Sequence, residues 1–508
     1  MIFNINATLL ASIFLLVALS DALPTKRNTG LLTMPLKRIT RNSADIHPLV
    51  ALQQHINRGD QRLARMTGRN GPTHEQCKES INKRMYIPEK PSSAVGQQRK
   101  RADGPLSGLN GKPAASVAVT ASAAATPPAA TPPAAPPAAP GNNSTAQGFP
   151  VVDLQGAING GLTVAKTPTT ANSLGLDIVA NDVGYVATFQ IGTPPKNFNL
   201  LMDSGSADFW VAATDCASLE TGQPCSKLHQ SLGTSSSSSF VDSGAPFNVT
   251  YGAGKVSGTI IKDNVVIANL SLPGHVFGAS SEESKEFSGD DIAFDGLVGL
   301  AKSTISNQGV PTPVESLASA GLISDAITSY KISRLADGLN DGEITFGGLD
   351  QTKFNTNSLV TVKNVNALGF WETGLDAVTV NGQDLGLKKR TTILDTGTTL
   401  MIVPAKDAAA IHAAIPGSQS DGQGGFTIPC TTTASVALTI GAKSFAIDPR
   451  DLTFLPEDPN NLTGNCVSGI SSGSVGGANE WLVGDVFLKN VYFSHDVGKN
   501  TISLASLV

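Results

Sequence analysis

Short alternations of apolar and polar residues recur along this chain of 508 residues, and they predict strands separated by turns. Residues 184–192 alternate in this way and stop at Thr193-Pro194-Pro195, which is a turn signal. Further strands are predicted over residues 198–202, 247–251, 255–267, 297–300, 343–346, 359–362, 374–380, 392–394, 436–440 and 491–495. We therefore expect an all-β fold with short helices.

Helical patterns are confined to a few segments. Residues 314–320 and 405–414 each begin next to a Pro, a residue that suits the first turn of a helix. Residues 47–66 place four apolar side chains on one face of an amphipathic pattern: Leu49, Leu52, Ile56 and Leu63. The 51 Gly, the 30 Pro and the 5% of aromatic residues agree with a chain that contains more turns than helices.

The N-terminus resembles a secretory leader. Residues 9–19 are apolar but too short to cross a bilayer, and the small residues Ala18 and Ser20 suit cleavage, so residues 1–20 are predicted to be a signal peptide. Its start is atypical, because the first positive side chain is Lys26. Since no other stretch is apolar enough to span a membrane, we expect a secreted protein, extracellular or, alternatively, vacuolar.

Charge divides the remainder into two parts. Residues 21–101 hold 16 Lys and Arg against 6 Asp and Glu, a net charge of +10, whereas residues 102–508 hold the other 20 and 35, a net charge of −15. A basic arm could bind nucleic acid, but this one contains the amphipathic pattern and ends at Arg99-Lys100-Arg101, a dibasic processing signal. A removable propeptide over residues 21–101 is the favoured interpretation.

Residues 114–140 are almost entirely Ala, Pro, Thr and Ser, a composition that favours extended polyproline II and cannot form a core. We interpret residues 102–176 as a spacer and an N-terminal extension.

The five cysteines are consistent with secretion. Cys216 and Cys225 would close a small loop, Cys430 and Cys466 would close a larger one, and Cys77 is left over. No close cluster of Cys and His predicts a metal site. Glycosylation sequons lie at Asn143, Asn248, Asn269 and Asn461.

One short phrase occurs twice in the chain. Asp203 ends an apolar strand and is followed by Ser204-Gly205-Ser206, and Asp395 ends another and is followed by Thr396-Gly397-Thr398. A single copy is explained by an ordinary Asp turn. Two copies with matching flanks predict a pair of carboxylates that share a proton and act on one water as general base and general acid.

From about Tyr185 to Ala505 the chain resembles the pepsin-like aspartic proteases, and a fungal-type, secreted member with a long propeptide fits best. The shared segments, in order, are residues 192–195, 203–211, 251–254, 295–300, 371, 395–399 and 482–488. The resemblance implies two β-rich lobes, over residues 177–340 and 341–508, with a cleft between them for an extended peptide.

The resemblance assigns a role to each residue of the two loops. Asp203 and Asp395 would bind the attacking water, Ser206 and Thr398 would hydrogen-bond the carboxylates, and Ser204 and Thr396 would tie the loops together. Gly205 and Gly397 would allow the tight turns. The family more often has Thr where this chain has Ser204, so a packing methyl is missing but the hydroxyl is kept.

The resemblance also implies a flap, a β-hairpin that closes over the cleft. Tyr251, with Gly252 and Ala253, would form its tip, and the indole N–H of Trp210 would hold the tyrosine hydroxyl. An ordinary hairpin with a packed aromatic residue is the alternative.

These features together predict an aspartic endopeptidase made as a zymogen, active at acid pH without a cofactor or metal. Its expected partners are peptide and protein substrates and its own propeptide; we expect a monomer that binds neither nucleic acid nor membrane. Phe370 beside Trp371, and Ile292 and Phe294, predict cleavage between hydrophobic residues. A non-catalytic peptide-binding glycoprotein of the same fold and a glycosidase are the rival hypotheses.

Overall fold

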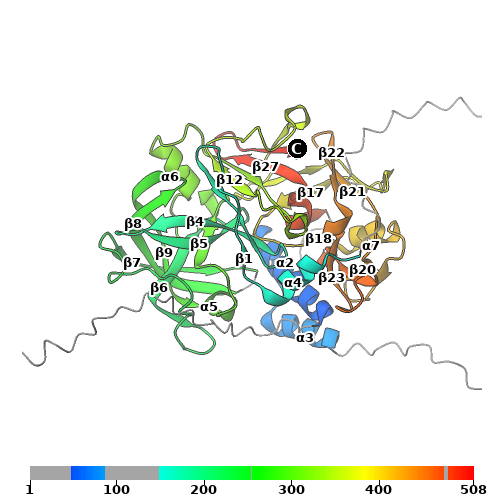
Figure 1. The fold of residues 1–508 in the computed structure, drawn as a ribbon, viewed down its shortest axis with the longest axis horizontal. Helices are drawn as coiled ribbons and strands as arrows, with labels where there is room; N and C mark the ends of the chain where they lie inside the picture. The colour runs from blue at the N-terminus through cyan, green and yellow to red at the C-terminus, as the bar shows by residue number, and fades with distance from the viewer. Residues whose placement is uncertain (1–46, 86–147, 253, 474–478) are drawn as a thin grey trace, which may run out of the picture. The chain divides into compact units, whose positions relative to one another are not determined.

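The computed structural model describes residues 47–85, 148–252, 254–473 and 479–508 (Figure 1). Its regular structure is mostly strand with a few short helices, so the predicted all-β, two-lobed class is confirmed. No helix in these ranges is both long and apolar enough to cross a membrane. The predicted signal peptide, the Arg99-Lys100-Arg101 site and the Ala/Pro spacer lie outside the described residues.

The first half of the catalytic region forms one large sheet. Its strands, in spatial order, are β1 (Leu162–Thr163), β3 (Asp177–Val179), β4 (Gly184–Ile191), β5 (Lys196–Asp203), β10 (Gly296–Gly299), β6 (Phe209–Ser218), β9 (Leu270–Glu283), β8 (Lys255–Ile267) and β7 (Val241–Thr250). Strands β7 and β8 form a hairpin whose tip follows Thr250. The alternating residues of β4 and β8 thus supply a sheet with a buried face, as their pattern predicts.

The second half forms three smaller sheets. The first contains β14 (Glu372–Leu375), β17 (Arg390–Leu394), β26 (Glu480–Val483), β18 (Met401–Pro404) and β25 (Ile470–Gly473). The second contains β16 (Gln383–Asp384), β15 (Ala377–Val380), β21 (Val436–Ile440) and β22 (Lys443–Ile447). The third contains β19 (Gln419–Ser420), β20 (Phe426–Pro429), β24 (Asn465–Ser468) and β23 (Thr453–Pro456).

A six-stranded sheet contains strands from both halves. Its order is β13 (Val360–Lys363), β28 (Thr501–Ser506), β27 (Val491–Asp496), β11 (Ile327–Lys331), β12 (Glu343–Phe346) and β2 (Ser173–Gly175). Since this sheet joins strands from both sides of residue 340, the lobe boundary given above stays a prediction.

The same local arrangement occurs once in each half. Strand β10 runs parallel to β5 and antiparallel to β6, and β26 runs parallel to β17 and antiparallel to β18. Glycines permit the close approach, because a β-carbon at Gly484 would lie 1.8 Å from the Thr398 carbonyl oxygen, and one at Gly299 would lie 2.5 Å from the Asp208 nitrogen. Two segments have the pattern hydrophobic-hydrophobic-Gly: Leu297-Val298-Gly299 in β10, and Leu482-Val483-Gly484 at the end of β26. They therefore brace the two Asp loops.

The longest described helix is α2 (Pro48–Met66), which lies in the predicted propeptide. Pro48 occupies its first turn and the His47 side chain accepts a hydrogen bond from the Leu49 N–H at 3.2 Å. Its apolar face, predicted from the sequence, is buried against β18, β24 and β25, and α3 (His74–Met85) packs beside it (Figure 1). The remaining helices are α4 (Val151–Asn159), α5 (Lys285–Ser288), α6 (Pro313–Ser319), α7 (Ala405–Ala413) and α8 (Asp485–Leu488), with short 3₁₀ turns at residues 303–305, 335–337, 356–358 and 449–452.

The extension before the first large strand is folded from residue 148 onward. Phe149 is buried against the Cys430–Cys466 disulfide, and its N–H donates to the Leu462 carbonyl at 2.7 Å. Strand β1 pairs with β3, and β2 pairs with β12. Residues 148–175 are thus integrated into the sheets and the core of the catalytic region.

The expected strand over residues 374–380 was wrong as a single element. The chain breaks at Asp376, whose N–H donates to the Thr439 carbonyl at 2.8 Å, so β14 and β15 belong to different sheets. Strands β6 and β9 were not predicted, because Asp and Thr interrupt the first and Pro273-Gly274 interrupts the second.

Candidate active site

The two Asp loops meet where the halves of the catalytic region face each other. Strand β5 ends at Asp203, and β17 ends at Leu394, directly before Asp395. Both carboxyl groups are fully buried. A β-carbon at Gly205 would lie 2.5 Å from Asp395 Oδ1, and one at Gly397 would lie 2.4 Å from Asp203 Oδ1. The absence of a side chain at these glycines therefore gives each carboxylate access to the opposite loop.

Each carboxylate accepts the same pair of hydrogen bonds. The Gly205 N–H donates to Asp203 Oδ1 at 2.9 Å and the Ser206 hydroxyl donates to Oδ2 at 2.6 Å. The Gly397 N–H and the Thr398 hydroxyl bind the two oxygens of Asp395 at the same 2.9 and 2.6 Å. These donors fix the orientation of both side chains, which is the geometry that a shared proton requires.

Two hydroxyls tie the loops together. The Ser204 N–H donates to Thr396 Oγ1 at 2.9 Å, and the Thr396 N–H donates to Ser204 Oγ at 3.0 Å. Each hydroxyl then donates to a backbone carbonyl of the opposite strand, Leu394 at 3.2 Å and Met202 at 2.9 Å. The structure thus brings all eight residues of the two phrases into one connected network.

The electrostatic environment favours a proton on the pair. Burial, with a further contribution from the charge of Asp203, raises the pKa of Asp395 to about 6, although the Arg62 guanidinium opposes this shift. Two carboxylates in such proximity, both excluded from water, cannot easily be ionised together. The pair is therefore suited to hold one proton at mildly acid pH.

Arg62 of α2 contacts both carboxylates. Its Nη2 donates to Asp395 Oδ1 at 2.7 Å and to Asp203 Oδ1, and its Nε lies against Asp395 Oδ2. The side chain is only 12% exposed, and the two carboxylates raise the pKa of its guanidinium above the ordinary value despite burial. Helix α2 therefore covers both carboxylates.

The flap hairpin closes on the same helix. The Trp210 indole N–H donates to the Tyr251 hydroxyl at 2.7 Å, as the resemblance implied. A β-carbon at Gly252 would lie 2.2 Å from the Arg58 carbonyl oxygen, so the flap rests directly on α2. The Arg65 guanidinium lies over the Tyr251 ring, 5.8 Å from its centre. Ala253 lies outside the described residues.

Two further ion pairs attach the helices to the second half. Arg69 binds Glu480, and Arg84 binds Asp421. The Arg84 side chain is fully buried, and burial lowers its pKa to about 10. Gly59 permits the closest approach, because a β-carbon there would lie 2.5 Å from Ile402 Cγ1. Charge and shape therefore both hold α2 and α3 against the catalytic region.

The sequence alone did not single out two residues of this site, Arg62 and Asp485. The sequence holds no signal that separates Arg62 from Arg58 and Arg65 of the same helix. Asp485 follows the Leu482-Val483-Gly484 segment, is 1% exposed, and has a pKa that burial raises well above its ordinary value. Neither of its carboxylate oxygens has a hydrogen-bond partner among the described residues.

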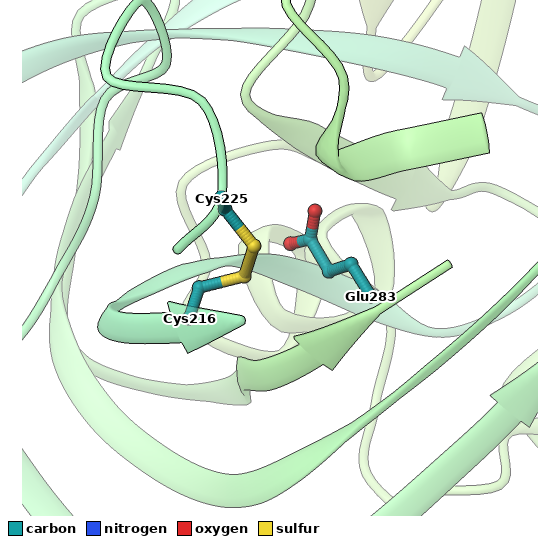
Figure 2. A group of neighbouring side chains, drawn as sticks. All are labelled: Cys216, Cys225 and Glu283. Carbon is teal, nitrogen blue, oxygen red and sulfur yellow. A yellow bond between two sulfur atoms is a disulfide. The ribbon is translucent and has the colours of Figure 1, made fainter. Parts of the chain in front are cut away.

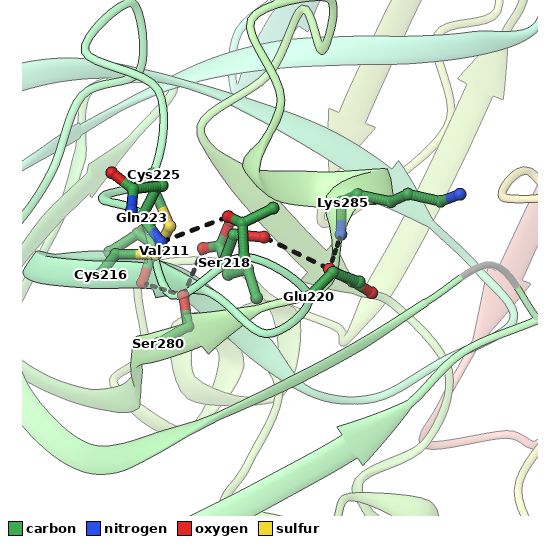
Figure 3. The surroundings of a disulfide bond; sticks show 10 residues. Val211, Cys216, Ser218, Glu220, Gln223, Cys225, Ser280 and Lys285 are labelled. Atoms are coloured by element: carbon green, nitrogen blue, oxygen red, sulfur yellow. Dashed lines mark hydrogen bonds between the residues drawn. A yellow bond between two sulfur atoms is a disulfide. The ribbon is translucent and has the colours of Figure 1, made fainter.

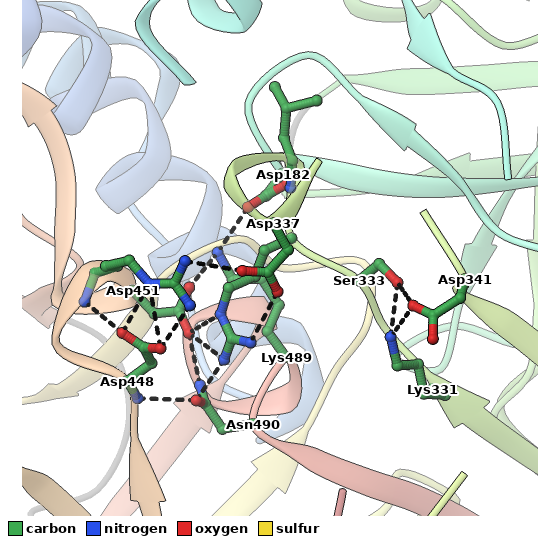
Figure 4. A network of polar contacts seen from close by, with 12 residues as sticks. Asp182, Lys331, Ser333, Asp337, Asp341, Asp448, Asp451, Lys489 and Asn490 are labelled. Carbon is green, nitrogen blue, oxygen red and sulfur yellow. Dashed lines mark hydrogen bonds and ion pairs between the residues drawn. The ribbon is translucent and has the colours of Figure 1, made fainter. Parts of the chain in front are cut away.

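A small cavity lies elsewhere, lined by Asp153, Asp182, Arg334, Asp451 and Lys489 among others, with about 30 Å³ of room for water-sized molecules. Lys489 bridges Asp182 at 3.1 Å and Asp451 at 2.9 Å, and Arg334 binds Asp451 at 2.7 Å (Figure 4). Burial would raise the pKa of Asp451, but Arg334 and Lys489 lower it to about 2. These charges neutralise one another, so we interpret the cluster as structural.

Both predicted disulfides are present, Cys216–Cys225 and Cys430–Cys466, and Cys77 is a free, half-buried thiol on α3. Glu283 points toward the first disulfide (Figure 2). Since both sulfurs are bonded to each other, these three residues do not form a metal site in this state. The sequons at Asn248, Asn269 and Asn461 are exposed, and Asn143 lies outside the described residues; their glycosylation stays a prediction.

Known proteins are similar in sequence to the part of the chain that carries the two Asp loops. A family model described as eukaryotic aspartyl protease matches residues 184–507. A probable aspartic-type endopeptidase CTSD from Arthroderma benhamiae is 35% identical over 345 residues, which cover 68% of this chain and 65% of that protein. The chain thus spans about 65% of the length of this relative.

Two other relatives extend the comparison. Rhizopuspepsin from Rhizopus chinensis is 35% identical over 329 residues, 64% of this chain and 79% of that protein. A probable vacuolar protease A from Trichophyton verrucosum is 30% identical over 349 residues, 67% of this chain and 83% of that protein.

Proposed function

The chain belongs to the eukaryotic aspartyl protease family, and we propose that it is an aspartic endopeptidase made as a zymogen. One observation carries the proposal: a single guanidinium, that of Arg62, binds both Asp203 and Asp395. A positive side chain between two buried carboxylates neutralises the group that would activate water and excludes the substrate from it. The same contact supports both the assignment of the dyad and its proposed latency.

The proposed reaction needs only the dyad and one water. The ionised carboxyl takes a proton from the water as its oxygen attacks the peptide carbonyl, while the protonated carboxyl donates to the carbonyl oxygen. The resulting tetrahedral gem-diol collapses when its nitrogen accepts the proton of the dyad while one of its hydroxyls gives a proton to the ionised carboxylate. The C–N bond then breaks, the amine leaves, a carboxylic acid forms, and the dyad again holds one proton. Ser206, Thr398 and the two glycine N–H groups hold the carboxylates in place throughout.

We propose that activation begins with acid. Acid weakens the attraction that Asp395, Glu480 and Asp421 exert on Arg62 in α2, Arg69 in the segment after α2 and Arg84 in α3. The basic segment therefore separates from the catalytic region as pH falls. Near neutral pH these ion pairs form and the dyad loses its shared proton. Activity should therefore be confined to acid pH.

Cleavage after Arg101 is the proposed route to the mature chain, with self-cleavage further on as the alternative. Either route places the mature start between Ala102 and about Asp182. The burial of Phe149 and the pairing of β1 support a start before Gly148, because a later cut would remove residues that pack into the core. N-terminal sequencing of the mature protein tests this range.

We propose cleavage between hydrophobic residues by a monomer that is secreted, with a vacuolar destination as the alternative. Phe294 is half-buried, and the centre of its ring lies 6.4 Å from that of Phe287. Phe287 in turn packs against the Tyr251 ring, which supports an apolar wall near the dyad. Trp371 supports it less, since its N–H donates to the Leu300 carbonyl and its ring stacks on His495. A cleavage profile dominated by Lys or Arg at the scissile bond would contradict this preference.

The decisive experiment follows hydrolysis of an internally quenched hydrophobic peptide by the full chain between pH 3 and 7. We expect Arg62→Gln to hydrolyse the peptide without a lag at mildly acid pH, where the wild-type chain is still latent. Lys83→Gln is the matched control, because Lys83 lies on α3, is 61% exposed and pairs with Glu79 of the same helix.

Two results would count against the proposal in different ways. If Arg62→Gln is as latent as the wild-type chain, Arg62 does not cause the inhibition, but the proposal that the protein is an enzyme still stands. No hydrolysis at any acid pH after complete removal of residues 1–101 would remove the activity itself.

A further inference from the structure

The Cys216–Cys225 disulfide closes a loop at the end of β6. Residues 216–226, which we name the disulfide loop, are held by the Ser218 N–H on the Gln223 carbonyl at 2.8 Å and the Cys225 N–H on the Cys216 carbonyl at 2.9 Å. Residues 220–224 of the loop are exposed, and Glu220 is one of them. It is thus a small, covalently closed unit on the surface of the first half (Figure 3).

The disulfide loop holds the short helix α5 at both ends. Glu220 Oε2 accepts a hydrogen bond from the Lys285 N–H at 2.8 Å, where α5 begins. The Ser226 N–H donates to the Ser288 carbonyl at 3.0 Å, where α5 ends. Contacts at both ends restrict the helix more than either contact alone, because they oppose sliding as well as tilting.

Buried contacts of Glu283 anchor the same loop. The Leu219 N–H donates to the Glu283 carbonyl at 2.8 Å, and the Glu283 carboxyl accepts from the Ser280 hydroxyl at 2.6 Å. The same hydroxyl lies 3.1 Å from the Val211 carbonyl, next to Trp210, and its single hydrogen can serve either acceptor (Figure 3). Strand β9, the disulfide loop and the strand that carries Trp210 are thereby connected.

Helix α5 in turn contacts the flap. Phe287 packs edge-on against the Tyr251 ring, 5.6 Å away, and against Trp210, 5.3 Å away. Ser284, directly before α5, exchanges two hydrogen bonds with Lys255, the first residue of β8 after the hairpin tip, at 2.9 and 3.0 Å. A β-carbon at Gly254 would lie 3.1 Å from the Phe287 ring. The position of α5 therefore determines where the flap tip and the Tyr251 hydroxyl lie.

We propose that the disulfide loop is a positioning device for the flap, with Glu220 as its main polar contact and α5 as the connecting element. The proposal rests on the proposed function, in which Tyr251 closes over a bound peptide. When the loop is opened or Glu220 is removed, α5 loses one of its two anchors, Phe287 moves and Tyr251 loses its lateral support. The hydrogen bonds of the dyad do not involve the disulfide loop or α5, so they stay intact.

The first test compares Glu220→Ala with Glu220→Gln in the acid-activated enzyme. We expect kcat/KM for a hydrophobic peptide to fall about threefold in the Ala variant, mainly through a higher KM, since one partly exposed hydrogen bond is lost. The Gln variant keeps an oxygen that can accept the Lys285 N–H and should restore KM. Asp384→Ala is the matched control, because Asp384 is also exposed and accepts a backbone N–H, that of Gly386 at 2.9 Å, in the other half.

The second test removes each disulfide in turn. Replacement of both Cys216 and Cys225 by Ser should raise KM about tenfold with little change in kcat, whereas replacement of Cys430 and Cys466 should lower thermal stability without this selective effect on KM. An equal KM for the two double variants would overturn the proposal. So would equal effects of Glu220→Ala and Glu220→Gln.

A third measurement does not depend on activity. Hydrogen–deuterium exchange of the full chain should be faster in Glu220→Ala than in wild type for residues 254–257 and 285–288, and unchanged around Asp395. Unchanged exchange in α5 would overturn the coupling. If exchange in α5 is faster but the protein hydrolyses no peptide, the link between the disulfide loop and the flap is supported and the proposed function is contradicted.

Discussion

The loops around Asp203 and Asp395 match in every hydrogen bond to their carboxylates, yet the positions that follow them differ. Seven residues after Asp203 stands Trp210, which holds the flap tyrosine. Seven residues after Asp395 stands Ile402, against which Gly59 of α2 packs. Equivalent positions thus contact the flap in one half and helix α2 in the other.

Buried carboxyls differ between the halves in the same way. Asp208, five residues after Asp203, is fully buried and accepts hydrogen bonds from the Ser306 hydroxyl, the Asn307 amide and the Gln308 N–H. Its counterpart is Leu400. In the second half a buried carboxyl, that of Asp485, directly follows Leu482-Val483-Gly484, whereas Leu300 follows the corresponding segment Leu297-Val298-Gly299 in the first half. The comparison teaches that the duplicated phrase forms the dyad, while the diverged surroundings assign each half a separate task.

The largest effect should come from breaking the matched pair itself. We expect Asp203→Asn and Asp395→Asn each to lower kcat of the activated enzyme by at least about a thousandfold, because an amide cannot exchange the proton. Thermal unfolding of each variant should show that the fold is intact. Substantial activity in either variant would mean that one half suffices.

The next largest effect should be a different dependence of the unfolding free energy on pH for buried carboxyls of the two halves. Burial raises the pKa of Glu283, in the first half, from 4.5 to about 7, and that of Asp485, in the second, well above its ordinary value. The folded state favours the neutral form of each. Their contribution to stability is therefore complete below the unfolded pKa and is lost as pH rises toward the folded pKa; for Glu283 the loss amounts to about 3 kcal/mol.

Accordingly, Glu283→Gln should reduce the fall in unfolding free energy between pH 4.5 and 7, and Asp485→Asn should reduce a fall that continues to higher pH. Urea unfolding in an Asp203→Asn background measures both without self-cleavage. Asp384→Asn, at an exposed carboxyl, is the control. A pH dependence identical to wild type in both variants would contradict the assignment.

The different tasks of Trp210 and Ile402 can be tested by substitutions at Gly59, which contacts Ile402, and at Trp210 itself. Gly59→Leu should weaken the docking of α2 by about 1–3 kcal/mol, because its side chain collides with Ile402, so latency is lost at higher pH. Trp210→Phe should leave latency unchanged and lower kcat/KM of the activated enzyme. If Gly59→Leu stays fully latent while Trp210→Phe does not, the two positions do not have the separate tasks proposed here.

The smallest effect should come from the symmetric contacts between the loops. Ser204→Ala and Thr396→Ala each remove one hydroxyl and leave a buried N–H unpaired, so we expect each to lower the unfolding free energy by about 1–2 kcal/mol. Thr396→Ser keeps the hydroxyl and should cost less. Clearly unequal losses for the two Ala variants would show that the symmetry of the network does not extend to its energetics.

The sequence by itself determined those parts of the molecule that depend on neighbouring residues. Alternation located β4 and β8, a Pro located the starts of α6 and α7, and the spacing of Leu49, Leu52, Ile56 and Leu63 located α2. The duplicated phrase identified the carboxylates, because strand, Asp, hydroxyl and Gly are all local features. Where local signals conflicted, as at Pro273-Gly274 in β9 or at Asp376 between β14 and β15, the prediction failed.

Only the tertiary structure decided which distant groups meet. Arg62 lies 141 residues from Asp203 and 333 from Asp395 in the chain, and no local pattern distinguishes it from the other arginines of α2. Its position follows from the rotation of the helix, which the burial of Leu63 and Ile56 and the close contact of Gly59 with Ile402 determine together. The link from Glu220 through α5 to Tyr251 arises in the same way, because hydrogen bonds and ring contacts form between surfaces that only the completed sheets bring together.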